Sequence, residues 1–234
     1  MAACILIAIM VLFLGWVLSR LGHNPHEYLD IPQVVENMDA NRNSIPDALD
    51  FVKGARREVQ NHTQYDAAYY SGGYPPEGRG ACSDVIWRAF REAGYDLKGM
   101  VDEDIRKTPA AYGRTGVLPD PNIDFRRVTN LVVFFERHGR ELTNKVIPGD
   151  KDNLIEWQPG DIVVFGPPWE HIGIISDRRR PDGVPFVLNN AAPVASEDDY
   201  LLRWPSRVTH HFRYSKYSRE PEAKDEIQVE YRRS

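Results

Sequence analysis

Cys82 is the residue of this sequence best suited to covalent chemistry. It follows the glycine-rich stretch PEGRGA (76–81) and begins a run with apolar residues at helical spacing, CSDVIWRAFREAGYD. This pattern predicts a helix that begins near Cys82 and ends at Gly94. The N-terminus of a helix lowers the pKa of a thiol, so the position favours a reactive thiolate. The alternative is that Cys82 is a small buried hydrophobic residue.

A histidine and an asparagine downstream have the spacing of a polar pair on neighbouring strands. Three short β-branched and aromatic runs, DIVVF (161–165), HIGIIS (171–176) and VPFVLNN (184–190), are separated by Pro/Gly turns and predict consecutive antiparallel strands. His171 begins the second strand and Asn189 lies on the third. With Cys82 as nucleophile, His171 would take the thiol proton and Asn189 would orient the imidazole. The alternative is a strand-end histidine without a special role.

Together these segments resemble the NlpC-type cell-wall cysteine peptidases, a compact papain-like group. The resemblance covers about residues 55–214 and is closest to a little-characterised domain-of-unknown-function branch, which often has His-Asn where this chain has Asn189-Asn190. Asn190 therefore remains an alternative to Asn189 as the third residue. The motifs that carry the resemblance are Tyr69-x-x-Gly72-Gly73, Cys82-Ser83, Pro159-Gly160-Asp161 and His171-Ile172-Gly173.

The resemblance implies an α+β, papain-like NlpC-type fold, with Cys82 on a helix packed against an antiparallel sheet that carries His171. It implies hydrolysis of amide bonds in peptidoglycan stem peptides without a catalytic cofactor. It also makes the Tyr69 hydroxyl and the Cys82 backbone N–H candidates to stabilise the oxyanion. Two alternatives stay open. One is a non-catalytic cell-wall-binding module, and the other is an amidase or transpeptidase that acts on another amide.

Three further side chains are candidates for substrate contacts. Asp84 lies in the first turn of the predicted helix, and Trp169 and Glu170 immediately precede His171. An aromatic and a carboxylate beside the catalytic base could contact a peptide. Packing at the rim of the core is the alternative for Trp169.

The segment DANRNSIPDALD (39–50) has the spacing of a calcium loop. Calcium loops take side-chain oxygens at positions 1, 3, 5, 9 and 12 and a main-chain carbonyl at position 7. The corresponding residues are Asp39, Asn41, Asn43, Asp47, Asp50 and, for the carbonyl, Ile45. The segment resembles the loops of dockerin and thrombospondin type-3 repeats, although Ser44 replaces the usual glycine at position 6. A structural Ca²⁺ is one interpretation, and a turn that caps the next helix is the other.

Composition and the terminal segments set the wider context. The 234 residues have a net charge of −5, which argues against a nucleic-acid partner. Cys4 lies in the uncharged run 2–18, so Cys82 has no intrachain disulfide partner. That run predicts a membrane anchor or signal segment. Arg20 after the run weakly opposes export, but the implied activity requires an extracytoplasmic, membrane-anchored or secreted protein of the cell envelope. The predicted units are the N-terminal segment 1–20, a linker with the calcium loop and a helix start at 21–54, the hydrolase domain 55–214 and a charged tail 215–234.

Overall fold

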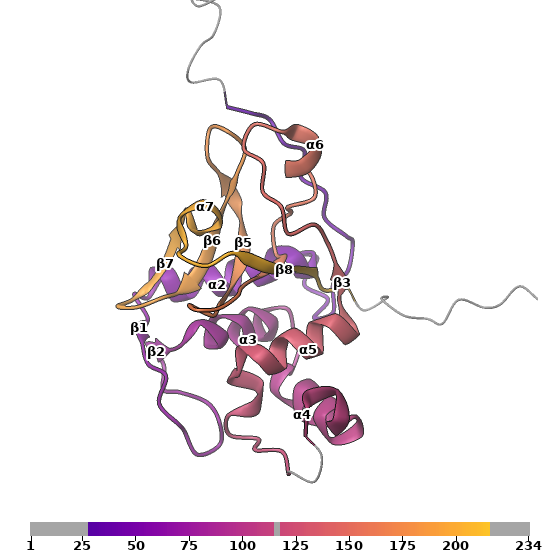
Figure 1. Ribbon diagram of the computed structural model, residues 1–234, viewed down its shortest axis with the longest axis vertical. Coiled ribbons are helices and arrows are strands. Elements are labelled where there is room, and N and C mark those ends of the chain that lie inside the picture. Colours follow the sequence, from indigo (N-terminus) through magenta and orange to yellow (C-terminus); the bar gives the residue numbers. More distant parts are fainter. Residues whose placement is uncertain (1–27, 115–117, 216–234) are drawn as a thin grey trace, which may run out of the picture.

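The computed structural model describes residues 28–114 and 118–215, which form a mixed α+β fold (Figure 1). The α+β class with an antiparallel sheet is therefore confirmed. The helices are α2 (Asp47–Gln60), α3 (Cys82–Glu92), α4 (Leu97–Lys107), α5 (Val128–His138), α6 (Lys151–Leu154) and α7 (Tyr200–Arg203), with short 3₁₀ helices η1 (Pro109–Tyr112) and η2 (Asp124–Arg126). The strands are β1 (Gln64–Tyr65), β2 (Arg79–Gly80), β3 (Arg140–Glu141), β4 (Ile162–Phe165), β5 (His171–Arg179), β6 (Pro185–Asn190), β7 (Ala195–Asp198) and β8 (Val208–Arg213).

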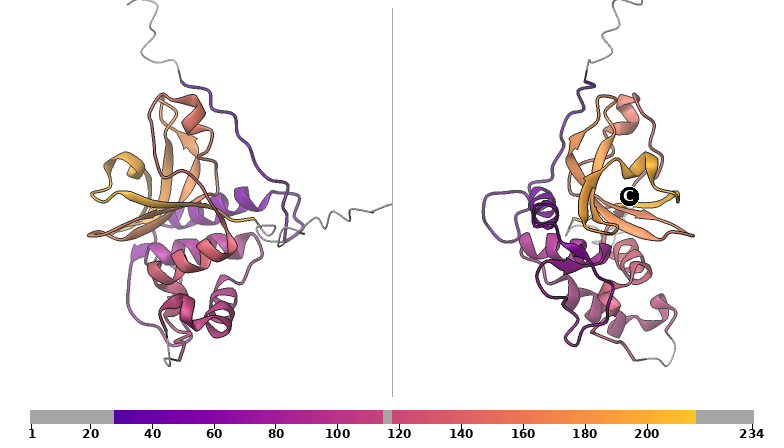
Figure 2. Two further views of the ribbon diagram at one scale, coloured as in Figure 1. Left: turned by 45° about the vertical axis from the view of Figure 1, so that its right-hand side comes forward. Right: turned by 90° about the vertical axis from the view of Figure 1, so that its left-hand side faces the viewer.

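Six of the strands form one antiparallel sheet in the order β3-β8-β4-β5-β6-β7. The predicted succession of three antiparallel strands is confirmed, because β4, β5 and β6 are neighbours in chain order. Helices α2 and α3 pack against each other and against β5 and β6, on one side of the sheet (Figures 1 and 2). The sheet therefore presents β5 to the helix that begins at Cys82.

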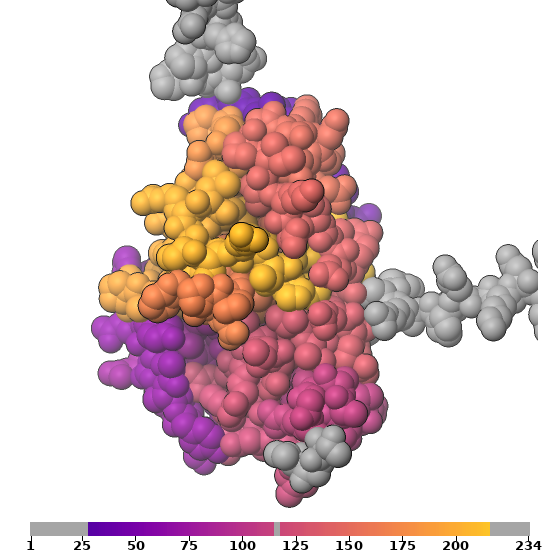
Figure 3. All heavy atoms as spheres, viewed as in Figure 1, coloured from indigo at the N-terminus to yellow at the C-terminus, as the bar shows by residue number. Residues whose placement is uncertain are grey.

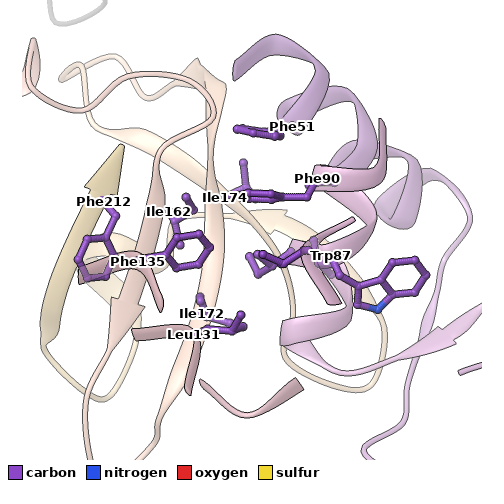
Figure 4. Close-up of a cluster of buried hydrophobic side chains, with 14 of the residues drawn as sticks. Phe51, Trp87, Phe90, Leu131, Phe135, Ile162, Ile172, Ile174 and Phe212 are labelled. Carbon is purple, nitrogen blue, oxygen red and sulfur yellow. The ribbon is translucent and has the colours of Figure 1, made fainter. Parts of the chain in front are cut away.

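The sheet is buried on both faces, which explains why its central strands are continuous apolar runs rather than alternating ones. Residues Ile162, Ile174 and Leu188 face α2 and α3, where Phe51 and Phe90 stack with ring centroids 4.4 Å apart (Figure 4). Their neighbours in the strands pack on the opposite face in a second cluster with α6 and α7, which includes Val163, Phe165, Ile175 and Val187. The space-filling view shows the yellow C-terminal segment crossing the middle of one face (Figure 3).

Helix α3 follows its sequence signals closely. Its first residue is Cys82, and the chain leaves the helix through Gly94, whose φ of +87° suits glycine. The backbone N–H of Ala81 donates to the Asp84 carboxylate at 2.6 Å and so caps the first turn. The predicted helix from Cys82 to Gly94 is confirmed. The predicted boundary between residues 54 and 55 falls within α2.

The predicted membrane segment 1–20 lies outside the described residues, as does the tail beyond residue 215. Within residues 28–114 and 118–215, no helix has the length and apolar character required to cross a bilayer.

Candidate active site

The thiol of Cys82 lies at the first position of α3, where the helix meets the sheet. Only 8% of the residue is exposed. Burial raises the pKa of the thiol to about 11, and this effect exceeds the opposing influence of the backbone N–H groups of Ile172 and Ser83. The expectation of a lowered pKa is therefore wrong, because desolvation outweighs the position at the helix N-terminus. Cys82 is a protonated thiol at neutral pH.

His171 and Asn189 are in contact, as the strand pattern predicted. Asn189 Oδ1 lies 3.0 Å from His171 Nε2, which assigns the proton to Nε2 and leaves the lone pair on Nδ1. Burial lowers the pKa of the imidazole to about 4, although the bond to Asn189 acts in the opposite direction. His171 is thus neutral at pH 7 and has a free proton acceptor. The approach of β6 requires Gly173, where a Cβ would lie 2.5 Å from Val187 Cγ1.

The neighbouring Asn190 has a different role. Its side-chain nitrogen donates to the carbonyl oxygens of Thr63 at 3.1 Å and Gly80 at 2.8 Å. These bonds tie the end of β6 to the chain just before Cys82. Of the two asparagines considered from the sequence, Asn189 is the one that contacts His171.

The structure brings the thiol and the imidazole to one junction of helix and strand. The backbone N–H of Ile172 interacts with the Cys82 thiol, and Ile172 directly follows His171 in β5. Trp204 stacks on the imidazole with centroids 4.4 Å apart and planes 19° apart. This packing fixes the plane of the ring and excludes water from one side of it.

Asp84 does not face a substrate. It is fully buried, and its two oxygens accept from Arg126 Nε and Nη2, each at 2.8 Å. Trp87 Nε1 donates to the same carboxylate at 2.8 Å. Arg126 also donates to the carbonyl of Ala68 at 2.7 Å. The interpretation of Asp84 as a substrate contact is corrected by this geometry: Asp84 caps α3 and joins it to the loop before β2.

The hydroxyl of Tyr69 is bound by Asp120 and Asn122. It donates to Asp120 at 3.2 Å and accepts from Asn122 Nδ2 at 2.7 Å, and 58% of the residue is exposed. The tyrosine that interacts with the thiol is instead Tyr65. Burial raises the pKa of its hydroxyl, and the negative charge of an ionised Cys82 raises this pKa further. Sequence analysis missed Tyr65 because only the two-residue pairing of β1 with β2, which sets Tyr65 opposite Gly80, brings it near.

Trp169 and Glu170, which precede His171 in the chain, lie at the surface. Trp169 is 62% exposed, and its carbonyl accepts from Trp204 Nε1 at 2.9 Å. Glu170 lines a largely apolar hollow of about 230 Å³ together with Phe165. A larger hollow of about 550 Å³ lies around Trp87 and Arg91 of α3, and neither Cys82 nor His171 lines it.

Comparisons with known proteins identify one family. The sequence pattern of the family described as "Domain of unknown function (DUF1287)" matches residues 52–214. The chain is also 39% identical over 196 residues to "Uncharacterized protein YijF" of Escherichia coli (strain K12), a match that spans 79% of this chain and 87% of that protein. No solved structure matches. The predicted membership of the NlpC-type peptidases is wrong, because the family that matches is DUF1287.

Proposed function

The chain belongs to the DUF1287 family, and on that premise we propose that it is a cysteine hydrolase that cleaves amide bonds in peptidoglycan stem peptides. The observation that carries this proposal is the His171–Asn189 pair at the start of β5, where the next residue, Ile172, contacts through its backbone N–H the Cys82 thiol at the start of α3. We include a papain-like architecture in the proposal, because α3 with its N-terminal thiol packs on the strand that begins with His171. Hydrolysis of this kind needs no metal.

The pKa values define how the reaction begins. At pH 7 both groups are neutral, since the thiol titrates near 11 and the imidazole near 4. His171 Nδ1 therefore removes the thiol proton as the sulfur attacks the carbonyl carbon, rather than beforehand. The Cys82 backbone N–H and the Tyr65 hydroxyl are suited to stabilise the oxyanion. Tyr65 takes the role that the sequence assigned to Tyr69.

The remaining steps follow from the same groups. The imidazolium donates its proton to the leaving nitrogen as the C–N bond breaks, which leaves an acyl thioester on Cys82 and a free amine. His171 then removes a proton from a water molecule that attacks the thioester. The carboxylic acid leaves, the sulfur recovers its proton, and the free enzyme is restored.

Peptidoglycan is proposed as the substrate because of location. The uncharged run 2–18 is suited to hold the domain at a membrane, and the proposal requires that the domain lie outside the cytoplasm, where stem peptides are abundant amides. The exposed Trp169 and Glu170 beside His171 are suited to contact such a peptide.

The test is digestion of purified peptidoglycan by the full chain in detergent micelles, with mass spectrometry of the released fragments. We expect new amine and carboxyl ends with the wild type, and none with Cys82→Ser or His171→Gln. Cys4→Ser is the matched control and should retain activity. Identical fragment patterns from the wild type and Cys82→Ser would overturn the proposal.

The second candidate function is a cell-wall-binding module without turnover. Its support is the deep burial of Cys82, which is 8% exposed, together with the raised pKa of its thiol. Sedimentation with intact sacculi distinguishes the two candidates. If the protein is a binding module, the wild type and the Cys82→Ser variant should sediment equally with the sacculi. Neither protein should release fragments.

A further inference from the structure

The loop 39–50, whose last four residues form the first turn of α2, folds its backbone around side-chain oxygens. Asp39 accepts from the N–H groups of Asn43 at 3.0 Å and Ser44 at 2.8 Å. Asn41 Oδ1 accepts from the Asn43 N–H at 3.0 Å, and Asn43 Oδ1 accepts from the Ile45 N–H at 2.7 Å. These bonds hold the side chains of loop positions 1, 3 and 5 against the backbone of the loop, and those positions supply oxygens in calcium loops.

Asp50, at position 12 of the loop, has one carboxylate oxygen without a hydrogen-bond partner. The residue is fully buried, and its Oδ2 accepts from the amide nitrogens of Asn41 at 2.9 Å and Asn43 at 2.8 Å. Its Oδ1 is buried without a hydrogen-bond partner. The nearest cation is Lys53 Nζ at 4.0 Å, which lies closer, at 2.9 Å, to Glu92. A buried carboxylate oxygen without a donor is costly, and a cation in the loop would satisfy it.

The donor set fits Ca²⁺ better than a transition metal. Within residues 28–114 and 118–215, no three His, Cys, Asp or Glu side chains are grouped to hold a metal ion. The loop instead offers two carboxylates, at Asp39 and Asp50, beside amide and main-chain oxygens, and calcium accepts such all-oxygen sets. The Asn amides can rotate to exchange the nitrogen that faces Asp50 for an oxygen.

Asp47, at position 9, is turned toward the protein. Its oxygens accept from the Ala40 N–H at 2.8 Å and the Tyr95 hydroxyl at 2.5 Å. Position 9 often binds calcium through a water molecule, so this orientation is compatible with the loop. Asn41 also donates to the carbonyl of Glu92 at 2.9 Å. The loop is thereby joined to the C-terminal end of α3.

We propose that residues 39–50 bind Ca²⁺ and that the ion braces α2 against the C-terminal end of α3. The direct ligands are Asp39, Asn41, Asn43, the Ile45 carbonyl and Asp50. With only two direct carboxylates, the expected Kd is in the range of extracellular modules, about 10⁻⁴–10⁻³ M. The site lies about 16 Å along α3 from Cys82, so the ion is structural rather than catalytic.

The first experiment measures the Tm of the full chain in detergent after chelation and during titration with CaCl₂ or MgCl₂. We expect a saturable rise in Tm with calcium and a much smaller one with magnesium. Asp39→Asn should lose most of the calcium response. Asp182→Asn, a matched change in the β5–β6 turn, should keep it. A wild-type Tm that does not respond to calcium up to about 10 mM, well above the expected Kd, would overturn the proposal.

Asn43→Asp provides the opposite change and a second test. In chelator, the added carboxylate faces Asp50 and should lower the Tm, because like charges repel. In calcium, the same carboxylate should lower the Kd about tenfold, because it adds a charged ligand. A turn that only caps α2 predicts the same loss of Tm in both conditions, and that result would also overturn the proposal.

Discussion

The two ends of helix α3 differ in the charge of the groups around them. At its N-terminal end, Cys82 and His171 are buried and neutral, with the pKa of each shifted away from its charged form. At its C-terminal end, Asp39 and Asp50 present carboxylates to a loop, and one oxygen of Asp50 has no hydrogen-bond partner. Both ends are tied to the same helix, so the difference arises from local environment rather than from fold.

The difference indicates what each end is suited to do. Neutral, desolvated groups can transfer a proton when a substrate arrives, because neither group is stabilised in its ionised form beforehand. A carboxylate with a vacant bonding direction is suited to hold a cation for long periods. The two ends can therefore be disturbed separately by single substitutions.

The largest effect is expected from Arg126→Met, which disturbs the N-terminal end. This change leaves the Asp84 carboxylate buried without its ion pair, whose side chains are 2% and 0% exposed. We expect the free energy of unfolding to fall by about 3–5 kcal/mol. Urea denaturation of the full chain measures it.

Arg79→Met is the matched control, since Arg79 pairs with Asp66 at the surface and is 57% exposed. It should change stability by less than about 1 kcal/mol. The calcium response at the far end of α3 should survive in both variants, because distant sites act additively. Loss of that response in Arg126→Met alone would show that the two ends are coupled.

The second prediction concerns alkylation of Cys82 by iodoacetamide in the Cys4→Ser chain. With a thiol pKa of about 11, the reactive thiolate at pH 7 is several hundred-fold scarcer than in free cysteine. We expect slow alkylation at pH 7 that accelerates up to about pH 10.5, and a rate in urea-unfolded chain that is several hundred-fold higher at pH 7. A fast reaction with a plateau near pH 7 would instead mean that Cys82 and His171 form an ion pair before substrate binds.

Sequence reasoning succeeded where the signal was local or periodic. The helix that begins at Cys82, the succession of β4, β5 and β6, and the neighbouring positions of His171 and Asn189 all follow from runs of apolar residues and Pro/Gly turns. These features depend on residues that are close in the chain or on adjacent strands. Their geometry is therefore encoded in spacing.

It failed where long-range packing decided the outcome. The pKa of the Cys82 thiol is raised because the folded chain buries it, and helix position alone predicted the opposite. Asp84 was assigned to substrate, although Arg126, 42 residues away, occupies its carboxylate. A motif suggested Tyr69, and Tyr65 was missed because only the β1–β2 pairing brings it near the thiol. No local pattern reports these contacts.

The third prediction is a pH dependence of stability that comes from His171. Its pKa is about 4 in the folded protein and 6.5 when unfolded, so between these values the unfolded chain binds more protons. Stability should therefore rise with pH from about 4 to 6.5, by about 3 kcal/mol, and be fully present above 6.5. Unfolding of the wild type and His171→Gln across this range measures the contribution. If both lose stability equally as pH falls, the imidazole is not buried in its neutral form.

The smallest effect is expected from Ser44→Gly in the loop at the C-terminal end of α3. Ser44 has a φ of +68°, a left-handed conformation that glycine adopts without strain. We expect Ser44→Gly to raise the free energy of unfolding by about 1 kcal/mol, with or without calcium, because it removes this strain. Ser44→Ala is the matched control: it removes the hydroxyl but keeps the Cβ, so it should not stabilise the protein. Equal stability of the two variants would place the effect in the hydroxyl rather than in the backbone. If only Ser44→Gly raises the free energy of unfolding, the rest of the fold holds position 6 of the loop in its calcium-loop conformation. The backbone strain at Ser44 would then be a property of this end of α3 that the N-terminal end does not share.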